Sequence, residues 1–169
     1  MITGTPVSVE EYLSTSYEPR CEYIDGALVP KAMATWKHGR LQLSIAVLIE
    51  KAFPHYDAIP ELTVRITEKE YLIPDLGVDR RDRRQDPYPV WPIHLSIEIV
   101  SPDDRLNELL SKCETYHAWG VPHAWVIDPQ TRRAWQYSKG EEPREVDSLG
   151  ELLAGDIHIR VADIFSALD

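Results

Sequence analysis

Two acidic residues interrupt segments that are otherwise apolar and suited to extended structure. In "YLIPDLGVD", residues 71–79, the middle of the segment holds Pro74 and Asp75, and neither residue pairs or packs well inside a sheet. In "IHLSIEIVSP", residues 93–102, Glu98 interrupts a run that fits a buried strand, where an unpaired carboxylate is costly. Carboxylates brought together near a core need a shared proton or a bound cation. The pair therefore predicts a cation site, and Mg²⁺ suits it because this hard ion takes oxygen ligands and keeps several waters.

A lysine on a predicted helix extends this set. Lys112 lies at the border of the helix's apolar stripe, from where its ammonium group can reach the end of the preceding strand. Carboxylates, a divalent cation and a lysine can together hydrolyse a phosphodiester. The cation polarises the phosphoryl oxygen and lowers the pKa of water, while the ammonium group orients that water or stabilises developing charge.

Three predicted strands must position the carboxylates, at residues 58–66, 71–79 and 93–101. Side chains alternate across a strand, so Glu98 shares a face with Ser96 and Val100. We expect Asp75 to share a face with Ile73 and Gly77 in the same way. If the second and third strands are neighbours, we expect the two carboxylates to converge, with oxygen atoms within about 5 Å of each other so that one cation can contact both.

The remaining segments predict helices and hairpins around these strands. Ser8 and Glu11 have the spacing of a capping box, and Asp25-Gly26 is a strong signal for a two-residue turn. The order of elements indicates an α/β fold, a mixed β-sheet flanked by helices, in one domain that spans residues 1–169. The expected elements are a short helix at 7–13, a hairpin at 21–29, helices at 38–53 and 104–119, a hairpin at 123–138, and a strand with a helical turn at 156–165.

The composition is that of an ordinary globular protein with a net charge of -10, which argues against nonspecific coating of nucleic acid. Two cysteines are too few for a disulfide framework, and no apolar run is long enough to span a membrane. The start of the chain lacks the features of a signal peptide, so we expect a cytoplasmic protein. Arg80 and Arg81 open the basic run "DRRDRRQD", which is either a solvated turn or a phosphate contact.

The "PD" of residues 74–75, the "EIV" of residues 98–100 and the helix that carries Lys112 resemble the signature of the PD-(D/E)XK, or restriction-endonuclease-like, superfamily. More specifically, the chain resembles the bacterial Uma-two family of restriction-endonuclease-like proteins over nearly its whole length. The matching segments are, in order, "CEYIDGALV", His38 at a helix start, "YLIPDLGV", "IEIVSPDDR", Lys112 with Tyr116, "WGVPHAWVIDP" and "LLAGDIHIRVADIF".

The resemblance implies a restriction-endonuclease-like fold and a Mg²⁺-dependent endonuclease that acts on DNA, with Mn²⁺ able to substitute and with a homodimer as the assembly. Val100 stands where the superfamily pattern has its lysine, and Lys112 on the following helix matches the position that the family uses instead. Asp75 and Glu98 would bind the metal. Glu22 matches an acidic residue that assists catalysis, and His38 matches a histidine that could touch the scissile phosphate.

Each of these residues also has a structural interpretation. Glu22 could be a surface strand residue, His38 a structural histidine at a helix start, and Lys112 a solvated lysine on a helix edge. Asp75 and Glu98 could belong to structural ion pairs. Two other functions stay open: a catalytically silent module that binds nucleic acid or protein, and a metal-dependent hydrolase of small phosphoesters, which the acidic net charge favours.

Overall fold

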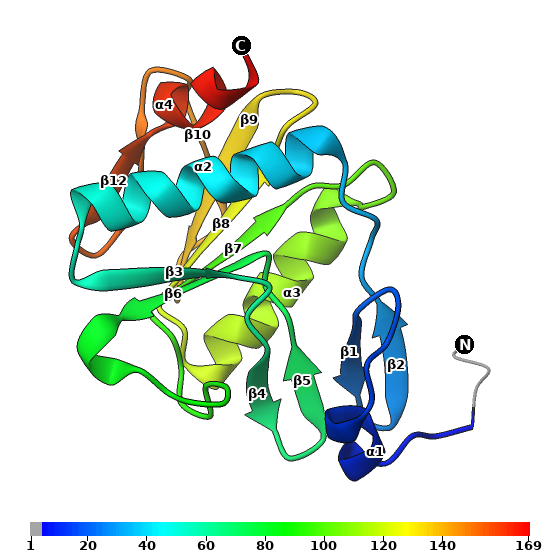
Figure 1. Cartoon of the computed structure of the whole chain (residues 1–169). Helices are drawn as coiled ribbons and strands as arrows, with labels where there is room; N and C mark the ends of the chain where they lie inside the picture. Colours follow the sequence, from blue (N-terminus) through cyan, green and yellow to red (C-terminus); the bar gives the residue numbers. More distant parts are fainter. Residues whose placement is uncertain (1–4) are drawn as a thin grey trace.

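The structure is a computed structural model that describes residues 5–169, and its main feature is a mixed six-stranded sheet (Figure 1). The order of this sheet is β10-β9-β8-β7-β6-β3, and β7 and β8 are its parallel pair. Its strands are β3 (Tyr56–Pro60), β6 (Leu76–Arg80), β7 (Leu95–Ile99), β8 (His123–Asp128), β9 (Arg133–Ser138) and β10 (Arg144–Val146).

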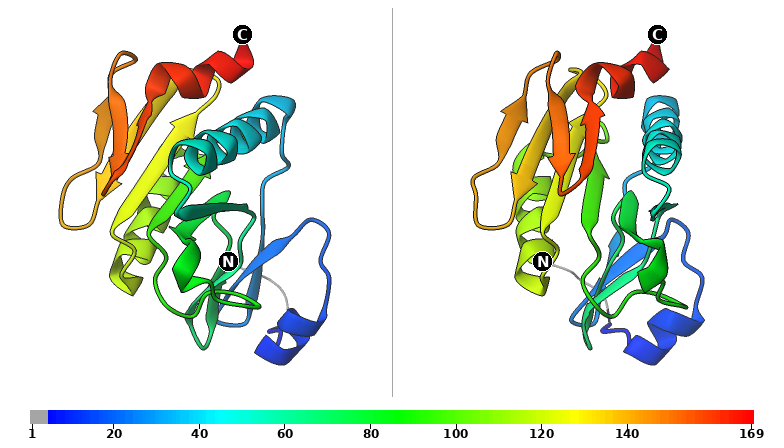
Figure 2. Two further views of the ribbon diagram at one scale, coloured as in Figure 1. Left: turned by 60° about the vertical axis from the view of Figure 1, so that its left-hand side comes forward. Right: turned by 90° about the vertical axis from the view of Figure 1, so that its left-hand side faces the viewer.

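Two helices cover the faces of this sheet, and Figure 2 shows them on opposite sides. Helix α2 (Trp36–Ala52) packs its buried residues Leu41, Ile45 and Ile49 against one face, in a core cluster that also contains Ile97. Burial of each of these aliphatic side chains contributes about 1.5–3 kcal/mol. Helix α3 (Leu106–Trp119) covers the other face and connects the parallel strands β7 and β8, as a parallel pair requires.

A second, antiparallel sheet lies beside the first, with the order β2-β1-β5-β4. Its strands are β1 (Cys21–Ile24), β2 (Ala27–Pro30), β4 (Val64–Thr67) and β5 (Glu70–Leu72). The short helix α1 (Val9–Ser14) packs Tyr12 against this sheet. The chain ends in a two-stranded ribbon, β11 (Glu151–Ala154) and β12 (Ile157–Arg160), followed by the short helix α4 (Val161–Phe165) and the 3-10 turn η2 (Ser166–Leu168). Another 3-10 turn, η1 (Arg81–Arg83), follows β6.

Two of the predicted strands are wrong as continuous elements, because each is divided between the two sheets. The segment 58–66 forms the end of β3 and the start of β4, and the segment 71–79 forms β5 and β6. Proline explains both divisions, since it lacks an N–H group for a sheet ladder. Pro60 is the last residue of β3, and Pro74 lies where the chain crosses from one sheet to the other. Asp75 therefore lies at this crossing, just before the first residue of β6, and not in the middle of one continuous strand.

The other expected elements agree with the structure. Asp25 and Gly26 have φ values of 46° and 89°, as a hairpin turn with two left-handed residues requires. Gly120 follows α3 with a φ of 124° and donates to the carbonyl groups of Tyr116 and His117, so it caps the helix. The mixed α/β fold flanked by helices is confirmed. Among residues 5–169, no helix is long and apolar enough to cross a membrane.

Candidate active site

A cavity of about 570 Å³ lies where the two sheets meet, beside the first turns of α2 and α3. It brings together five of the seven predicted site residues, which come from both sheets, both helices and the crossing segment. These five residues are Glu22, His38, Asp75, Glu98 and Lys112. Each of the four His and carboxylate residues has less than a tenth of its surface exposed, so their charges must be balanced within the protein.

Asp75 is held by donors on every side. Its Oδ2 accepts a 2.7 Å hydrogen bond from the backbone N–H of Ile99 and lies 3.2 Å from Nε2 of His38. Its Oδ1 accepts a 2.8 Å bond from Nζ of Lys31. Burial alone would raise the pKa of this carboxyl, but the hydrogen bond from His38 and the charge of Lys31 outweigh it and hold the pKa well below its ordinary range. Asp75 is therefore an anion at neutral pH.

Glu98 has the opposite electrostatic character. It lies on β7, on the face away from α2, and its Oε1 accepts hydrogen bonds from Nζ of Lys112 at 2.9 Å and from the hydroxyl of Tyr116 at 3.0 Å. Burial raises its pKa to about 7; the charge of Lys112 opposes this rise, and the charge of Asp75 adds to it. Two carboxylates in one cavity thus have pKa values shifted in opposite directions, a pattern typical of functional sites.

Lys112 links the two sheets through its ammonium group. Its Nζ lies 2.7 Å from Oε1 of Glu22 and 2.9 Å from Oε1 of Glu98. Burial favours the neutral amine, but the charges of Glu98 and Glu22 outweigh this effect and raise the pKa of Lys112, so it stays a cation. Glu22 is itself fixed, because its Oε1 also accepts a 2.7 Å bond from the N–H of Ile73. Lys112 is therefore part of a buried ion network and is not a solvated lysine on the helix edge.

Sequence analysis missed three residues of this network. Lys31 lies 2.8 Å from Asp75 Oδ1 and 3.2 Å from Glu61 Oε2, and it also donates to the carbonyl of Ile73. Tyr116, to which the sequence analysis gave no role in the site, donates to Glu98. In the first hairpin Glu22 pairs with Val29, so their side chains lie on the same face of the sheet. Lys31 follows Val29 by two residues and projects to that face as well, and this alternation could have identified it. Glu61 was missed because it lies in the predicted strand 58–66, at the position where the structure has a loop between β3 and β4.

Arg80 and Arg81 do not line the cavity. They lie at the far end of β6 from Asp75, where both side chains are about half exposed. Arg80 makes a two-bond contact with Asp82, at 2.9 and 2.7 Å, and Nε of Arg81 donates to Asp57 at 2.7 Å. Their predicted contact with phosphates stays a prediction.

The donor set fits a hard cation better than a zinc ion. Among residues 5–169, no three His, Cys, Asp or Glu side chains gather as metal ligands, which a zinc site would require. Mg²⁺ needs only one or two carboxylates because it keeps several waters. Leu76 pairs with Ile97 across β6 and β7, so the next pair in register is Asp75 and Glu98. Their separation of about 5 Å or less stays a prediction.

Backbone atoms also border the position between Asp75 and Glu98 that a cation would take. Ile99 lines the cavity although its side chain belongs to the core cluster on the opposite face of the sheet. Main-chain atoms of Ile99 therefore face the carboxylates, and a carbonyl oxygen is a ligand type that Mg²⁺ accepts. Asp75 and Glu98 would hold the ion, with backbone and water completing its shell.

A mixed sheet covered by two helices, with buried carboxylates and a lysine where its strands β6 and β7 meet the second sheet, defines a restriction-endonuclease-like α/β protein. The family model of Uma2, described as "Putative restriction endonuclease", matches residues 9–160. The chain therefore belongs to the Uma2 family, and the resemblance found in the sequence is confirmed. No curated protein matches the chain.

A solved structure has the same fold. A crystal structure of "a putative nuclease belonging to DUF820" from Anabaena variabilis has a TM-score of 0.84 and 23% identity, and the likeness covers 97% of this chain and 100% of that chain. A cryoEM structure of a DrdV-DNA complex has a TM-score of 0.45 and 19% identity over 75% of this chain and 10% of that chain. The second likeness is too low for its site to be compared with this one.

Proposed function

We propose that this protein is a Mg²⁺-dependent endonuclease that hydrolyses DNA phosphodiester bonds. The observation that carries the proposal is the ammonium group of Lys112, which is held between the buried carboxylates Glu98 and Glu22 in the cavity that also contains Asp75. Membership of a family described as a restriction endonuclease supports the same reaction class.

Each residue has a role that its contacts support. Asp75 and Glu98 hold the cation, which when bound supplies Lewis acidity to the phosphoryl oxygen and to water. Val100 stands at the position of the motif lysine, and Lys112 supplies the ammonium group instead. This group orients the attacking water or stabilises developing charge. Glu22 keeps it in position. Lys31 is the counter-ion of Asp75 when no cation is bound.

His38 is suited to contact a phosphate. Burial lowers the pKa of its imidazole, but the hydrogen bond and the charge of Asp75 outweigh burial and raise it. Its Nε2 faces Asp75, and its buried Nδ1 has no partner among residues 5–169. Arg80 and Arg81 are proposed to contact phosphates of a longer duplex. A homodimer, with Mn²⁺ able to replace Mg²⁺, is part of the proposal, because two sites would suit cleavage of both strands.

Plasmid nicking in Mg²⁺ tests the proposal, with EDTA as the metal-free control. Glu98→Gln keeps the size of the side chain and Lys112→Ala removes the ammonium group, and we expect each to lower the rate by about 10²–10³-fold. Lys69→Ala, at a lysine with 75% of its side chain exposed, is the matched control and should cut as wild type. Thermal melts of every variant separate lost catalysis from lost folding. Equal nicking by wild type, Glu98→Gln and Lys112→Ala would show that this cavity is not the active site.

One observation favours the silent module as a second candidate. Each carboxylate of the predicted metal pair already has an ammonium partner, Lys31 for Asp75 and Lys112 for Glu98. A silent protein would keep these pairs and bind no metal, so calorimetric titration with Mg²⁺ separates it from an enzyme. A hydrolase of small phosphoesters would instead cleave a chromogenic phosphodiester in preference to plasmid.

A further inference from the structure

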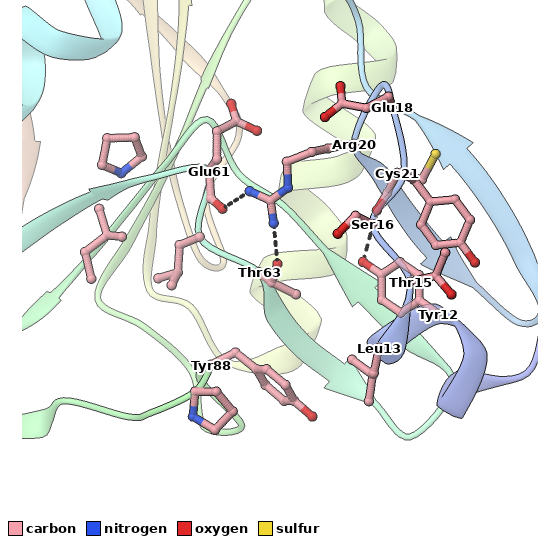
Figure 3. Close-up of a pocket in the computed structure, with 15 residues that line it drawn as sticks. Tyr12, Leu13, Thr15, Ser16, Glu18, Arg20, Cys21, Glu61, Thr63 and Tyr88 are labelled. Carbon is pink, nitrogen blue, oxygen red and sulfur yellow. Dashed lines mark hydrogen bonds between the residues drawn. The ribbon is translucent and has the colours of Figure 1, made fainter.

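A second cavity, of about 800 Å³, adjoins the candidate active site and has a different lining (Figure 3). Glu18, Arg20 and Glu61 line both cavities, so the two cavities lie next to each other at these residues. Most of the remaining lining is aromatic or aliphatic, with a few hydroxyl side chains, and comes from α1, the segment after it, the β3-β4 loop and the loop before Tyr88. A volume in this range is that of a pocket for a small organic group.

Tyrosine rings form one wall of this second cavity. Tyr12 and Tyr17 stack with their planes 18° apart and their centroids 6.2 Å apart, and Tyr71 contacts both Tyr12 and Tyr88 edge-on or tilted. Tyr17 and Tyr88 keep part of their surface exposed. Leu13, which also lines the cavity, is an apolar side chain left 45% exposed. A flat aromatic ligand would extend this stack and cover that apolar surface.

The polar groups of the cavity suit a nucleobase and not a phosphate. Glu18 is a carboxylate, which repels phosphate but accepts hydrogen bonds from the amino groups of bases. Arg20 already uses two of its N–H groups within the protein, on the carbonyl of Glu61 at 2.8 Å and on Thr63 at 2.9 Å (Figure 3). The hydroxyl of Tyr17 is buried without a hydrogen-bond partner among residues 5–169.

We propose that this second cavity, the base pocket, binds an unstacked nucleobase of the strand whose phosphate lies in the adjoining carboxylate cavity. The inference rests on the proposed nuclease function and defines its substrate class. A base inside a perfect duplex is stacked and paired, so it cannot enter such a pocket without leaving the helix. The preferred substrate is therefore DNA with a single-stranded or unpaired nucleotide beside the bond that is cut.

Binding to three short fluorescent DNA duplexes tests this proposal in EDTA, where no cleavage occurs. The first duplex carries one unpaired nucleotide, the second carries an abasic residue at that position, and the third is fully paired. We expect wild type to bind the first duplex about 5- to 150-fold more tightly than the other two, the factor expected from stacking one base on aromatic side chains.

Variants of the pocket locate this preference. Tyr88→Ala removes a ring of the wall, and Leu13→Asp places a charge on its exposed apolar rim; both should lose the preference for the unpaired base while they keep their binding to the paired duplex. Leu153→Asp is the matched control, since Leu153 is 42% exposed on β11 and lines neither cavity. It should keep the full preference, and all variants should melt near wild type.

The outcomes also separate this proposal from the nuclease assignment. Equal binding to all three duplexes, failure to bind any of them, or a preference that Tyr88→Ala and Leu13→Asp leave intact overturns the base pocket. If plasmid is still cut in a Lys112-dependent manner, the nuclease assignment survives that loss. A preference that depends on the pocket in a protein that cuts nothing supports the base pocket and overturns the nuclease.

Discussion

An acidic and a basic side chain form an ion pair near each end of β6, but one pair is buried and the other is exposed. At the start of the strand, the side chains of Asp75 and Lys31 are 6% and 14% exposed and share their contacts with several partners. At the end, the side chains of Arg80 and Asp82 are 52% and 64% exposed and form a two-bond contact with each other. Water screens the second pair much more strongly than the first. Burial, and not the number of charges, therefore distinguishes the candidate site from the basic loop.

Removal of a buried cation gives the largest expected effect. Lys112→Ala leaves Glu22 and Glu98 without their shared partner, and we expect the free energy of unfolding to fall by about 3–5 kcal/mol in chemical denaturation. Arg80→Ala is the exposed counterpart and should leave the unfolding midpoint almost unchanged. Adding Glu22→Gln to Lys112→Ala should recover part of the loss. Equal destabilisation by the two alanine variants would show that burial does not separate the two ends.

The pH dependence of stability sharpens the comparison. The pKa of Glu98 is raised from 4.5 to about 7, so the folded protein binds this proton more tightly than the unfolded chain does. The contribution of Glu98 is therefore fully present below pH 4.5 and is lost as the pH rises through about 7. We expect wild type to lose up to about 3 kcal/mol relative to Glu98→Gln across this range in EDTA. Parallel stability curves for the two proteins would contradict the raised pKa.

A smaller effect is expected from returning the lysine to its motif position. Val100→Lys in the Lys112→Ala background should restore plasmid nicking by about tenfold, because an ammonium group reaches the cavity by another route. Complete rescue is not expected, because Val100 packs in the apolar cluster of α3 and a new lysine must leave that cluster to reach the carboxylates. Val100→Met is the control for shape. No recovery with lysine, or equal recovery with methionine, would argue against a shared role.

The smallest effect is expected at the exposed end of the strand. Arg80→Ala with Arg81→Ala should weaken DNA binding a few-fold and lower the slope of log affinity against log salt by about 2, with no change in sequence preference. Fluorescence anisotropy at several salt concentrations measures this. Both arginines already have carboxylate partners, Asp82 and Asp57, so an unchanged slope would assign them to the fold and not to DNA.

The sequence identified the residues that break an apolar pattern, and it failed where the pattern itself was misleading. Glu98 was found because a carboxylate inside "LSIEIV" demands a partner, and the alternation along β7 was correct. Asp75 was found for the same reason, but the continuous strand predicted around it was wrong because Pro74 divides the segment between two sheets. The helices and the hairpins at 21–29 and 123–138 depend on local capping and turn signals, so they were predicted closely, whereas strands β10 and β11 were not predicted.

Partners that meet through tertiary packing had no local signal. Tyr116 fits an apolar helix stripe by type and spacing, and only its distance to Glu98 shows its polar role. Glu61 lies in a loop that reads as strand, and its contact with Lys31 joins segments that are far apart in the chain. Pro60 and Pro74 were the available signals for the two divided strands, since proline is rare inside sheets.

The hydrogen bond from Ile73 to Glu22 closes a loop of 51 residues, which has a consequence for how the chain folds. Contacts that join distant segments form late, because their loop-closure entropy must be met before they add stability. Each sheet can form its own hairpins early, yet the charges of Glu22 and Lys112 find their partners only when the sheets have come together. We therefore expect folding intermediates to carry these groups still hydrated, and the last barrier to include the removal of their water.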